Sequence, residues 1–238
     1  INGNILTVDK SNSRAQAVAV GDGVILAVGT NEAALAAAGQ DAVIIDLAGK
    51  TMLPGFIDAH SHFYQTGLRT VTEANLNSPP IGAVTCVDDI IALLREWAQA
   101  APPGRLVKGF GYDDTSLREK RRLNRDDLDK VSTEHPVIVR HISGHLHAFN
   151  SKALTLAGIT KETPDPSDGI FCRDDVTGEP TGVVEEALDM VNKMLSNITA
   201  AQEQQAVATA NAIYSRAGVA LARTGAPRSI REVNLIRQ

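Results

Sequence analysis

The sequence predicts an α/β protein in two parts, a small β-sandwich lobe followed by strands that alternate with helices. Short Val- and Ile-rich runs separated by turn residues fill the first part. After Pro54-Gly55 the pattern changes, and strand-like runs alternate with amphipathic ones. The chain has 238 residues, 43% of them hydrophobic, which is enough for a sizeable core. Alternating strands and helices are typical of a parallel sheet, open or closed.

The first part is expected to span residues 1–53. Its predicted strands are residues 1–8, 15–20, 24–28 and 42–46, and a short helix is expected at residues 32–38. Gly21-Asp22-Gly23 joins two of these strands, and Asp-Gly between apolar runs is a strong hairpin signal. These elements predict the β-sandwich lobe.

The second part is expected to span residues 54–238. Its predicted strands are residues 56–62, 106–110 and 136–141, with a further candidate at 219–222. Its predicted helices are residues 88–100, 125–131, 151–157, 183–195 and 199–217. Apolar residues at helical spacing predict the first helix, and Asn124 and Thr199 with Gln202 are capping signals for two others. Residues 163–182, rich in Pro, Gly and Asp, are expected to form a loop or hairpin.

Composition and missing motifs exclude several functional classes. A net charge of −5 argues against nucleic acid as the main partner, and no apolar run reaches the roughly 18 residues of a membrane span. Neither a glycine-rich phosphate loop nor a GxSxG nucleophile elbow is present. Two cysteines without a CxxC spacing indicate a reducing, cytoplasmic compartment. The expected partner is a small-molecule substrate, with no nucleic acid and no membrane, and self-association as a homo-oligomer stays open.

The sharpest chemical signal lies in residues 53–62, LPGFIDAHSH. On a strand, alternate side chains share a face, so Asp58, His60 and His62 point the same way. Two imidazoles at i and i+2 can reach one metal ion. Asp58 can accept a hydrogen bond from one of the metal-binding side chains and so orient it. The carboxyl end of a strand is also where α/β folds place their sites. Surface or core histidines are the alternative.

A second group of histidines follows the strand at residues 136–141. The segment 141–147, HISGHLH, brings His141, His145 and His147 close to a strand's carboxyl end. These residues could supply metal ligands, bind substrate or form a polar loop. The sequence leaves the three alternatives open.

A pair of carboxylates, Glu185 and Glu186, is expected at the start of the helix at residues 183–195. Solvated acidic residues suit the positive end of a helix dipole. The alternative is functional, because an anionic oxygen can bridge two nearby divalent cations.

Taken together, the residues resemble the N-terminal part of the metal-dependent amidohydrolase superfamily, in the branch called amidohydrolase family 3. The resemblance runs from residue 1 to about residue 218, and its order and spacing are specific. It rests on the segments Gly21-Asp22-Gly23, 46–47, 49–50, 53–62, 109–113, 128–129, 136–137, 143–145, 150–154, 157–159, 163–166, 178–182 and Glu186. It implies a β-sandwich lobe beside a partial TIM-like (β/α) barrel that holds one or two zinc ions.

The resemblance also implies site residues. His60 and His62 are the implied metal ligands, and Glu186, rather than Glu185, is the matching acid that binds or bridges metal. His145 and Asn150 match the substrate pocket, although Asn150 has a competing role as a helix cap.

The implied reaction is hydrolysis of a carbon–nitrogen bond, other than a peptide bond, in an amide or cyclic amide by metal-activated water. No histidine follows His147, and residues 219–238 depart from the family pattern, so the catalytic aspartate is expected beyond this chain. A complete barrel needs about 250 residues. We therefore expect an N-terminal fragment that is inactive alone. The alternatives are a non-catalytic remnant, a regulatory or partner-binding piece, or a complete small metal-binding protein.

Overall fold

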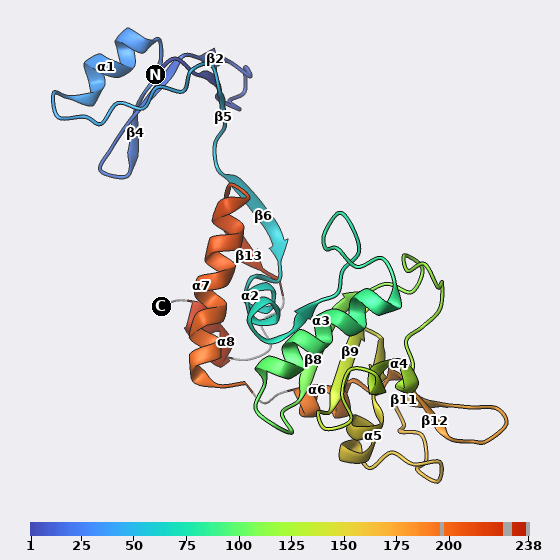
Figure 1. Ribbon diagram of the computed structural model, residues 1–238. Helices are drawn as coiled ribbons and strands as arrows, with labels where there is room; N and C mark the ends of the chain where they lie inside the picture. Colours follow the sequence, from blue (N-terminus) through green and yellow to red (C-terminus); the bar gives the residue numbers. More distant parts are fainter. Residues whose placement is uncertain (196–197, 226–229, 237–238) are drawn as a thin grey trace. The chain divides into compact units, whose positions relative to one another are not determined.

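The computed structural model describes residues 1–195, 198–225 and 230–236 (Figure 1). The chain divides into two compact units. Unit 1 comprises Ile1–Ala59 and Tyr214–Arg223, and unit 2 comprises His60–Ile213 and Thr224–Gln238. The sequence analysis placed the boundary after residue 53.

Unit 1 contains two small sheets and one helix. In the first sheet, β1 (Asn4–Leu6) lies between β2 (Arg14–Ala15) and β5 (Thr51–Met52). The second sheet is the hairpin of β3 (Ala17–Gly21) and β4 (Val24–Gly29). Asp22 and Gly23 turn with positive φ values of 50° and 76°, as a two-residue hairpin loop requires, so the predicted hairpin is confirmed. Helix α1 (Asn31–Ala38) follows, capped by the Thr30 hydroxyl.

The strand predicted at residues 42–46 is wrong. These residues are not paired in a sheet, and Val43, Ile44 and Ile45 are exposed, Val43 to 90%. A strand exists only where a neighbour accepts its backbone hydrogen bonds, and no described strand lies alongside this run. An apolar, β-branched pattern therefore gave a false signal here.

Unit 2 is built on a six-stranded mixed sheet in the order β11-β12-β10-β9-β8-β7. Strands β7 (Ala74–Asn75), β8 (Val107–Tyr112) and β9 (Val137–His141) are parallel. Strands β10 (Leu146–Phe149), β12 (Pro180–Glu186) and β11 (Gly169–Arg173) pair antiparallel. The predicted α/β class is confirmed, but the sheet is parallel only in part. The described strands do not close into a barrel.

Two further strands form a separate pair. Strand β6 (Phe56–Ser61) pairs with β13 (Val219–Thr224), and both lie where the sequence predicts strands. The Phe56 amide donates to the Gly218 carbonyl at 2.9 Å. This pair carries the histidine motif, because β6 leads directly into His60 and His62.

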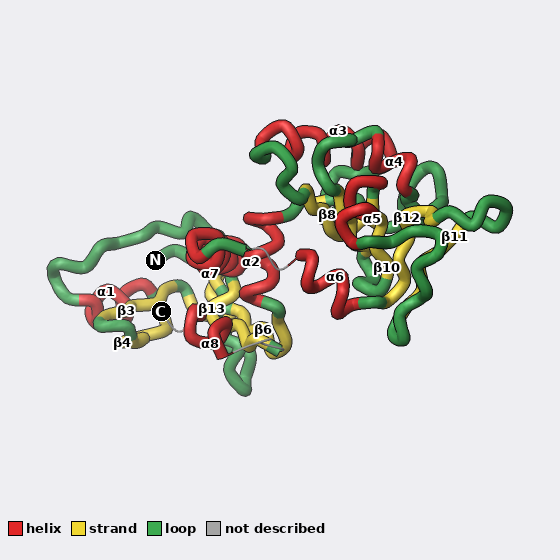
Figure 2. Tube along the Cα trace, turned by 90° about the horizontal axis from the view of Figure 1, so that it is seen from below, coloured by secondary structure: helices red, strands yellow, loops and turns green. Residues whose placement is uncertain are grey.

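The helices of unit 2 are α2 (Phe63–Thr72), α3 (Val87–Ala100), α4 (Arg125–Asp129), α5 (Ser151–Ala157), α6 (Leu188–Leu195), α7 (Ala200–Arg216, which crosses into unit 1) and α8 (Ile230–Ile236). Helices α3 and α6 lie on opposite sides of the sheet strands (Figure 2). No helix in the described residues is long and apolar enough to cross a membrane.

The two faces of the sheet carry different cores. Helix α3 buries Ile90, Ile91 and Leu94 in a cluster with Val137 and Val139. The opposite face packs Ile138, Phe149 and Val184 against helices α5 and α6. Side chains that alternate along β9 therefore serve both cores, as expected for a strand buried on both sides.

The helix predicted at residues 183–195 begins five residues later, because residues 180–186 form strand β12. Gly182 has a φ of +90°, and a Cβ there would lie 2.4 Å from the Phe149 carbonyl oxygen. This close approach lets β12 pair with β10 on one side and β11 on the other. Glu185 and Glu186 therefore lie at the carboxyl end of strand β12, directly before helix α6 and not in its first turn.

We expect Leu94→Ala to lower the free energy of unfolding by about 2–5 kcal/mol, because Leu94 is fully buried and its truncation leaves a cavity. Leu156→Ala, an identical change at an exposed helical position, should cost less than about 0.5 kcal/mol. Urea unfolding followed by the fluorescence of Trp97, which packs against the same core and is the single tryptophan, measures both. Equal losses for the two variants would contradict this assignment of the core.

Candidate active site

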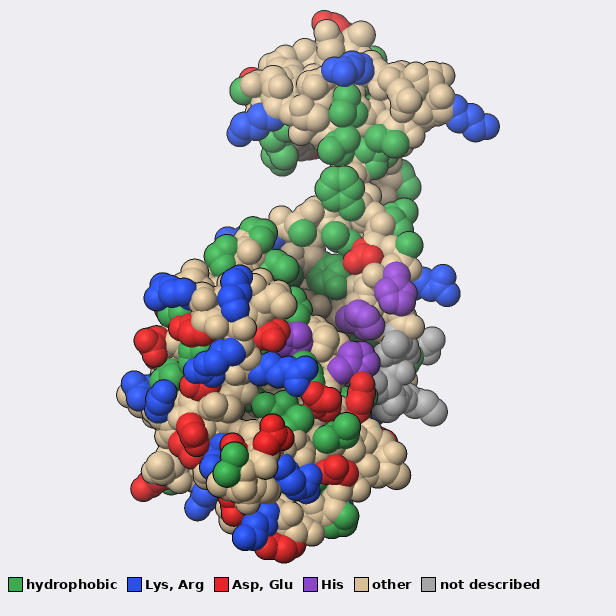
Figure 3. All heavy atoms as spheres, turned by 90° about the vertical axis from the view of Figure 1, so that its right-hand side faces the viewer, with side chains coloured by type: hydrophobic (Ala, Val, Ile, Leu, Met, Phe, Trp, Pro, Cys, Tyr) green, Lys and Arg blue, Asp and Glu red, His purple; other side chains and the backbone are tan. Residues whose placement is uncertain are grey.

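His60 and His62 lie at the carboxyl end of β6, and both side chains are exposed. Their ring centroids are 5.5 Å apart, and the rings are nearly perpendicular at 86°. Two imidazoles bound to one tetrahedral zinc ion through Zn–N bonds of about 2.0–2.1 Å place their centroids about 5 Å apart. The separation of the two ring centroids is therefore close to that of two imidazoles on one metal ion. Figure 3 shows histidine side chains gathered on one face of unit 2, beside acidic side chains.

The backbone that follows β13 packs against His60. The Gly225 amide donates to the Ser61 carbonyl at 2.7 Å. A Cβ at position 225 would lie 2.6 Å from Cε1 of the His60 ring, so any larger residue would displace the imidazole. Glycine at this position lets the chain hold His60 at the end of its strand.

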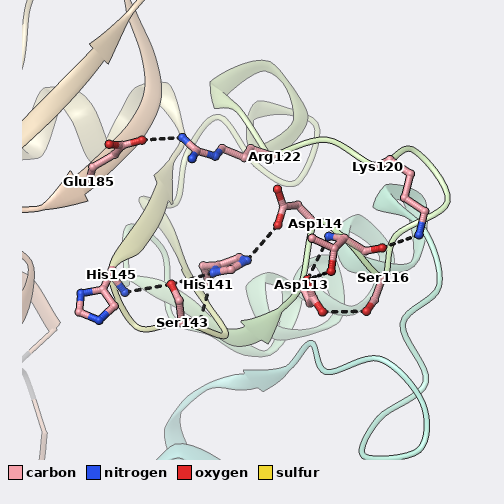
Figure 4. A network of polar contacts seen from close by, with 10 residues as sticks. Asp113, Asp114, Ser116, Lys120, Arg122, His141, Ser143, His145 and Glu185 are labelled. Carbon is pink, nitrogen blue, oxygen red and sulfur yellow. Dashed lines mark hydrogen bonds and ion pairs between the residues drawn. The ribbon is translucent and has the colours of Figure 1, made fainter.

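A second group that could hold a metal ion consists of Asp113, Asp114 and His141, whose ligand atoms all lie within 4.8 Å of one another. Nε2 of His141 is 3.1 Å from a carboxylate oxygen of Asp114 (Figure 4). The Thr115 and Ser116 hydroxyls donate to Asp113, and these hydrogen bonds hold the pKa of its carboxyl below the usual value. The group therefore offers two carboxylates and one imidazole.

The sequence analysis missed this group as a unit. Its signal was present, because Asp113 and Asp114 directly follow β8 and His141 ends β9. In the parallel pair, Tyr112 lies opposite His141, which brings the two carboxyl ends together. Only the register, a product of folding, shows that the residues meet.

Glu186 contacts His145 through both its side chain and its backbone. Nδ1 of His145 is 2.9 Å from Oε1 of Glu186, and the Glu186 amide donates to the His145 carbonyl at 2.7 Å. Glu185 instead forms an ion pair with Arg122 at 2.5 Å (Figure 4). Of the two adjacent acids, Glu186 therefore remains beside the histidine segment.

His60, His62 and Glu186 do not form a group of three within 4.8 Å in the described part of the chain, where Asp113, Asp114 and His141 are the one group that does. The three-residue ligand set thus stays a prediction. Asp58 is half-buried on β6, two residues before His60.

Asn150 is fully buried and caps helix α5. Its Oδ1 accepts from the amides of Val137 and Ala153, at 2.9 and 2.8 Å. Its Nδ2 donates to the carbonyls of Ser132 and His135, both at 2.9 Å. These four bonds use the full capacity of the amide, so a contact with substrate would require breaking one of them. The competing role as a helix cap is confirmed.

A cavity of about 730 Å³ lies beside His62 in unit 2. Its lining includes Arg69 from α2, Phe110 from β8, and Arg140 and His141 from β9. Phe110 lies opposite Asn75 on one neighbouring strand and opposite Arg140 on the other. The three parallel strands thus present one row of side chains at their carboxyl ends. The sequence predicted two of these three strands. It did not predict which side chains lie next to one another, because that depends on the register of the strands.

The chain belongs to the amidohydrolase family, whose pattern it matches over residues 43–232. Among curated relatives, an N-substituted formamide deformylase from Arthrobacter pascens is 38% identical over 187 residues, which cover 79% of this chain and 34% of that protein. The putative amidohydrolase YtcJ from Bacillus subtilis is 32% identical, over 83% of this chain and 36% of that protein. The family match extends beyond residue 218, into the segment that the sequence analysis set apart.

The fold also resembles a solved structure, that of an uncharacterized metal-dependent hydrolase from Pyrococcus horikoshii. The TM-score is 0.66 at 22% identity, over 100% of this chain and 44% of that one. The corresponding protein from Pyrococcus furiosus gives a TM-score of 0.64 at 24% identity. The chain spans about a third of the length of the curated relatives reported above.

His147 generates a prediction about stability. Its ring is 1% exposed, and neither ring nitrogen has a hydrogen-bond partner among the described residues. Burial, followed by the positive charge of nearby Arg140, lowers the pKa of His147 to about 3. The folded state therefore keeps this imidazole neutral, whereas the unfolded chain protonates it near the usual histidine pKa of 6.5.

Between pH 6.5 and about pH 3 the unfolded state binds the extra proton, so the free energy of unfolding should fall as the pH is lowered. This group contributes up to about 1.4 kcal/mol per pH unit. We expect His147→Leu to remove that slope and His145→Gln, at an exposed histidine, to retain it. Urea unfolding at pH 7, 6 and 5 measures the slopes, and an unchanged slope in His147→Leu would refute the assignment.

Proposed function

We propose that this protein is a metal-dependent hydrolase that cleaves carbon–nitrogen bonds, other than peptide bonds, in small amides or cyclic amides. The observation that carries the proposal is the pair of exposed imidazoles, His60 and His62, at a separation that suits one zinc ion. Membership of the amidohydrolase family and the name of the formamide deformylase relative support the same reaction class.

The proposed roles follow from the contacts. His60 and His62 hold the metal, with Gly225 packed against the His60 ring. Glu186 is the third donor, since catalytic zinc sites commonly use three protein ligands and His145 holds its carboxylate at the end of β12. Bound zinc supplies an activated water and polarises the substrate carbonyl. We assign no catalytic aspartate to residues 1–238.

The proposed architecture is that of a TIM-like (β/α) barrel preceded by a β-sandwich lobe at residues 1–53. We assign the parallel strands β7, β8 and β9 of unit 2 to that barrel, and their parallel pairing supports the assignment. Their carboxyl ends carry Asn75, Asp113 and His141, as barrel enzymes carry their functional groups at this end.

The group of Asp113, Asp114 and His141 gives a second candidate position for the metal. It offers harder donors, two carboxylates and one imidazole, and would suit a second cation in a two-metal site. The two positions are separable by substitution, because they share no residue.

Zinc content after dialysis, measured by mass spectrometry on the 238-residue chain, tests the proposal. We expect His60→Ala and His62→Ala each to lose most of the bound zinc, because a two-imidazole site cannot survive with one. Asp114→Asn should retain the zinc held by the two histidines. Absorption of the cobalt-substituted chain should report tetrahedral coordination in the wild type and its loss in His62→Ala.

Three outcomes would count against parts of the proposal. A wild-type chain that retains no zinc would refute the metal site. Zinc that is lost in Asp114→Asn but kept in His60→Ala would move the site to the carboxylate group. Zinc-dependent turnover of a simple formamide or cyclic amide by the 238-residue chain would contradict the expectation that this chain is inactive alone.

A further inference from the structure

The cavity beside His62 has a distinctive charge. Its volume of about 730 Å³ lies within the range of roughly 300–1,000 Å³ that is typical of small-molecule sites. Two guanidinium groups, from Arg69 and Arg140, and the imidazoles of His62 and His141 line it. Among the described residues that line it there is neither aspartate nor glutamate. The cavity is therefore cationic, although the chain as a whole carries a net charge of −5.

Phe110 organises the two arginines. The guanidinium carbon of Arg69 lies 5.7 Å from the centroid of the Phe110 ring, in cation–π geometry. Arg140 is the direct neighbour of Phe110 on the adjacent strand. The ring thus lies beneath the guanidinium of Arg69 and in register with Arg140, and both arginines line the same cavity.

Helix α2 fixes the distance between Arg69 and the proposed metal ligand. His62 precedes the first residue of α2, and Arg69 lies in its last turn. At 1.5 Å rise per residue, the two positions are about 10 Å apart along the helix axis. A small substrate can therefore reach both ends, with its reacting bond near His62 and a charged group near Arg69.

Nearby acids belong to a neighbouring cavity. Arg69 and Arg140 also line a space of about 360 Å³ that contains Glu73, Glu203 and Glu232. There Glu203 forms an ion pair with Arg231. The arginines thus lie between a mixed-charge cavity and one that holds only cationic and neutral side chains.

A further donor lies on the row of parallel strands. Asn75 lines the cavity and accepts through Oδ1 from the side chain of Asn77 at 2.8 Å, and the NH₂ group of the same amide is a further donor. Two planar guanidinium groups and an amide donor together match a carboxylate, which accepts paired N–H bonds.

We propose that the substrate carries a carboxylate, which Arg69 and Arg140 bind, and an apolar group that packs on Phe110. The inference names the substrate class of the proposed hydrolase, and it rests on that function only for the position of the reacting bond. The recognition of the anion itself needs neither metal nor turnover, because all its contacts come from side chains of unit 2.

Binding of a matched pair of probes tests the proposal. N-formyl-L-phenylalanine and its C-terminal amide differ by one charge and share the aromatic group. Isothermal titration of the 238-residue chain at low salt should show that the acid binds at least about tenfold more tightly than the amide. The preference should shrink as salt is raised, since the screening length falls to roughly 8 Å at physiological ionic strength.

Substitution identifies the residues. Arg69→Gln and Arg140→Gln should each weaken binding of the acid about tenfold and leave binding of the amide unchanged. Arg118→Gln, at an exposed arginine outside the cavity, is the matched control and should change neither. Trp97 fluorescence and circular dichroism establish that each variant is folded, and the wild-type comparison of acid with amide needs no variant.

Three results would overturn the inference. These are equal affinity for acid and amide, an unchanged acid preference in both arginine variants, or inorganic phosphate that competes more strongly than the acid. Zinc content of the same variants separates the two proposals. If Arg69→Gln binds as much zinc as the wild type but has lost the preference for the acid, both the metal site and the anion site would be supported. If the wild-type chain prefers the acid but binds no zinc, the proposed hydrolase function would be refuted and the anion site would be supported.

Discussion

The parallel register of β7, β8 and β9 is the constraint on which the site of unit 2 depends. Parallel strands end at the same edge of a sheet, and the pairing aligns Asn75, Phe110 and Arg140 in one row. The same register brings His141 to the end of β8, beside Asp113 and Asp114. A slip of one residue along β9 would turn Arg140 to the opposite face and separate His141 from the carboxylates.

Several features could be predicted from the sequence because their causes are local. The Asp22-Gly23 hairpin depends on residues that tolerate positive φ, and the Asn150 cap depends on a side chain three residues before the amide it accepts from. The strand that leads to His60 and His62 is marked by an apolar run after the turn at Pro54-Gly55. In each case the interacting groups lie within a few residues of one another.

Features that depend on distant pairing could not be predicted in the same way. Residues 42–46 have the apolar, β-branched pattern of a strand but no partner in the described residues. Residues 183–186 look like a helix start, yet β10 and β11 both pair with them and Gly182 permits the approach. The Asp113, Asp114 and His141 group and the arginine pair likewise follow from strand order and register.

The sheet of unit 2 also shows why its two faces have different roles. One face presents Val107, Val137 and Val139 to helix α3, and this purely apolar packing holds the strands in register. The other face, by alternation and cross-strand register, carries Lys108, Arg140 and His147 among the apolar side chains of the second core.

Burial lowers the pKa of Lys108 and of His147, which means that the fold opposes positive charge on that second face. At His147, whose ring nitrogens have no hydrogen-bond partner among the described residues, stability alone would favour an apolar residue, since a buried, unpaired polar group costs about 1–3 kcal/mol. Perturbed titratable groups of this kind cluster at functional sites. The basic face opens, at its carboxyl edge, onto the cavity that contains Arg140 and His62. The fold therefore carries basic residues that cost stability on the face of the sheet whose carboxyl edge reaches the proposed anion site.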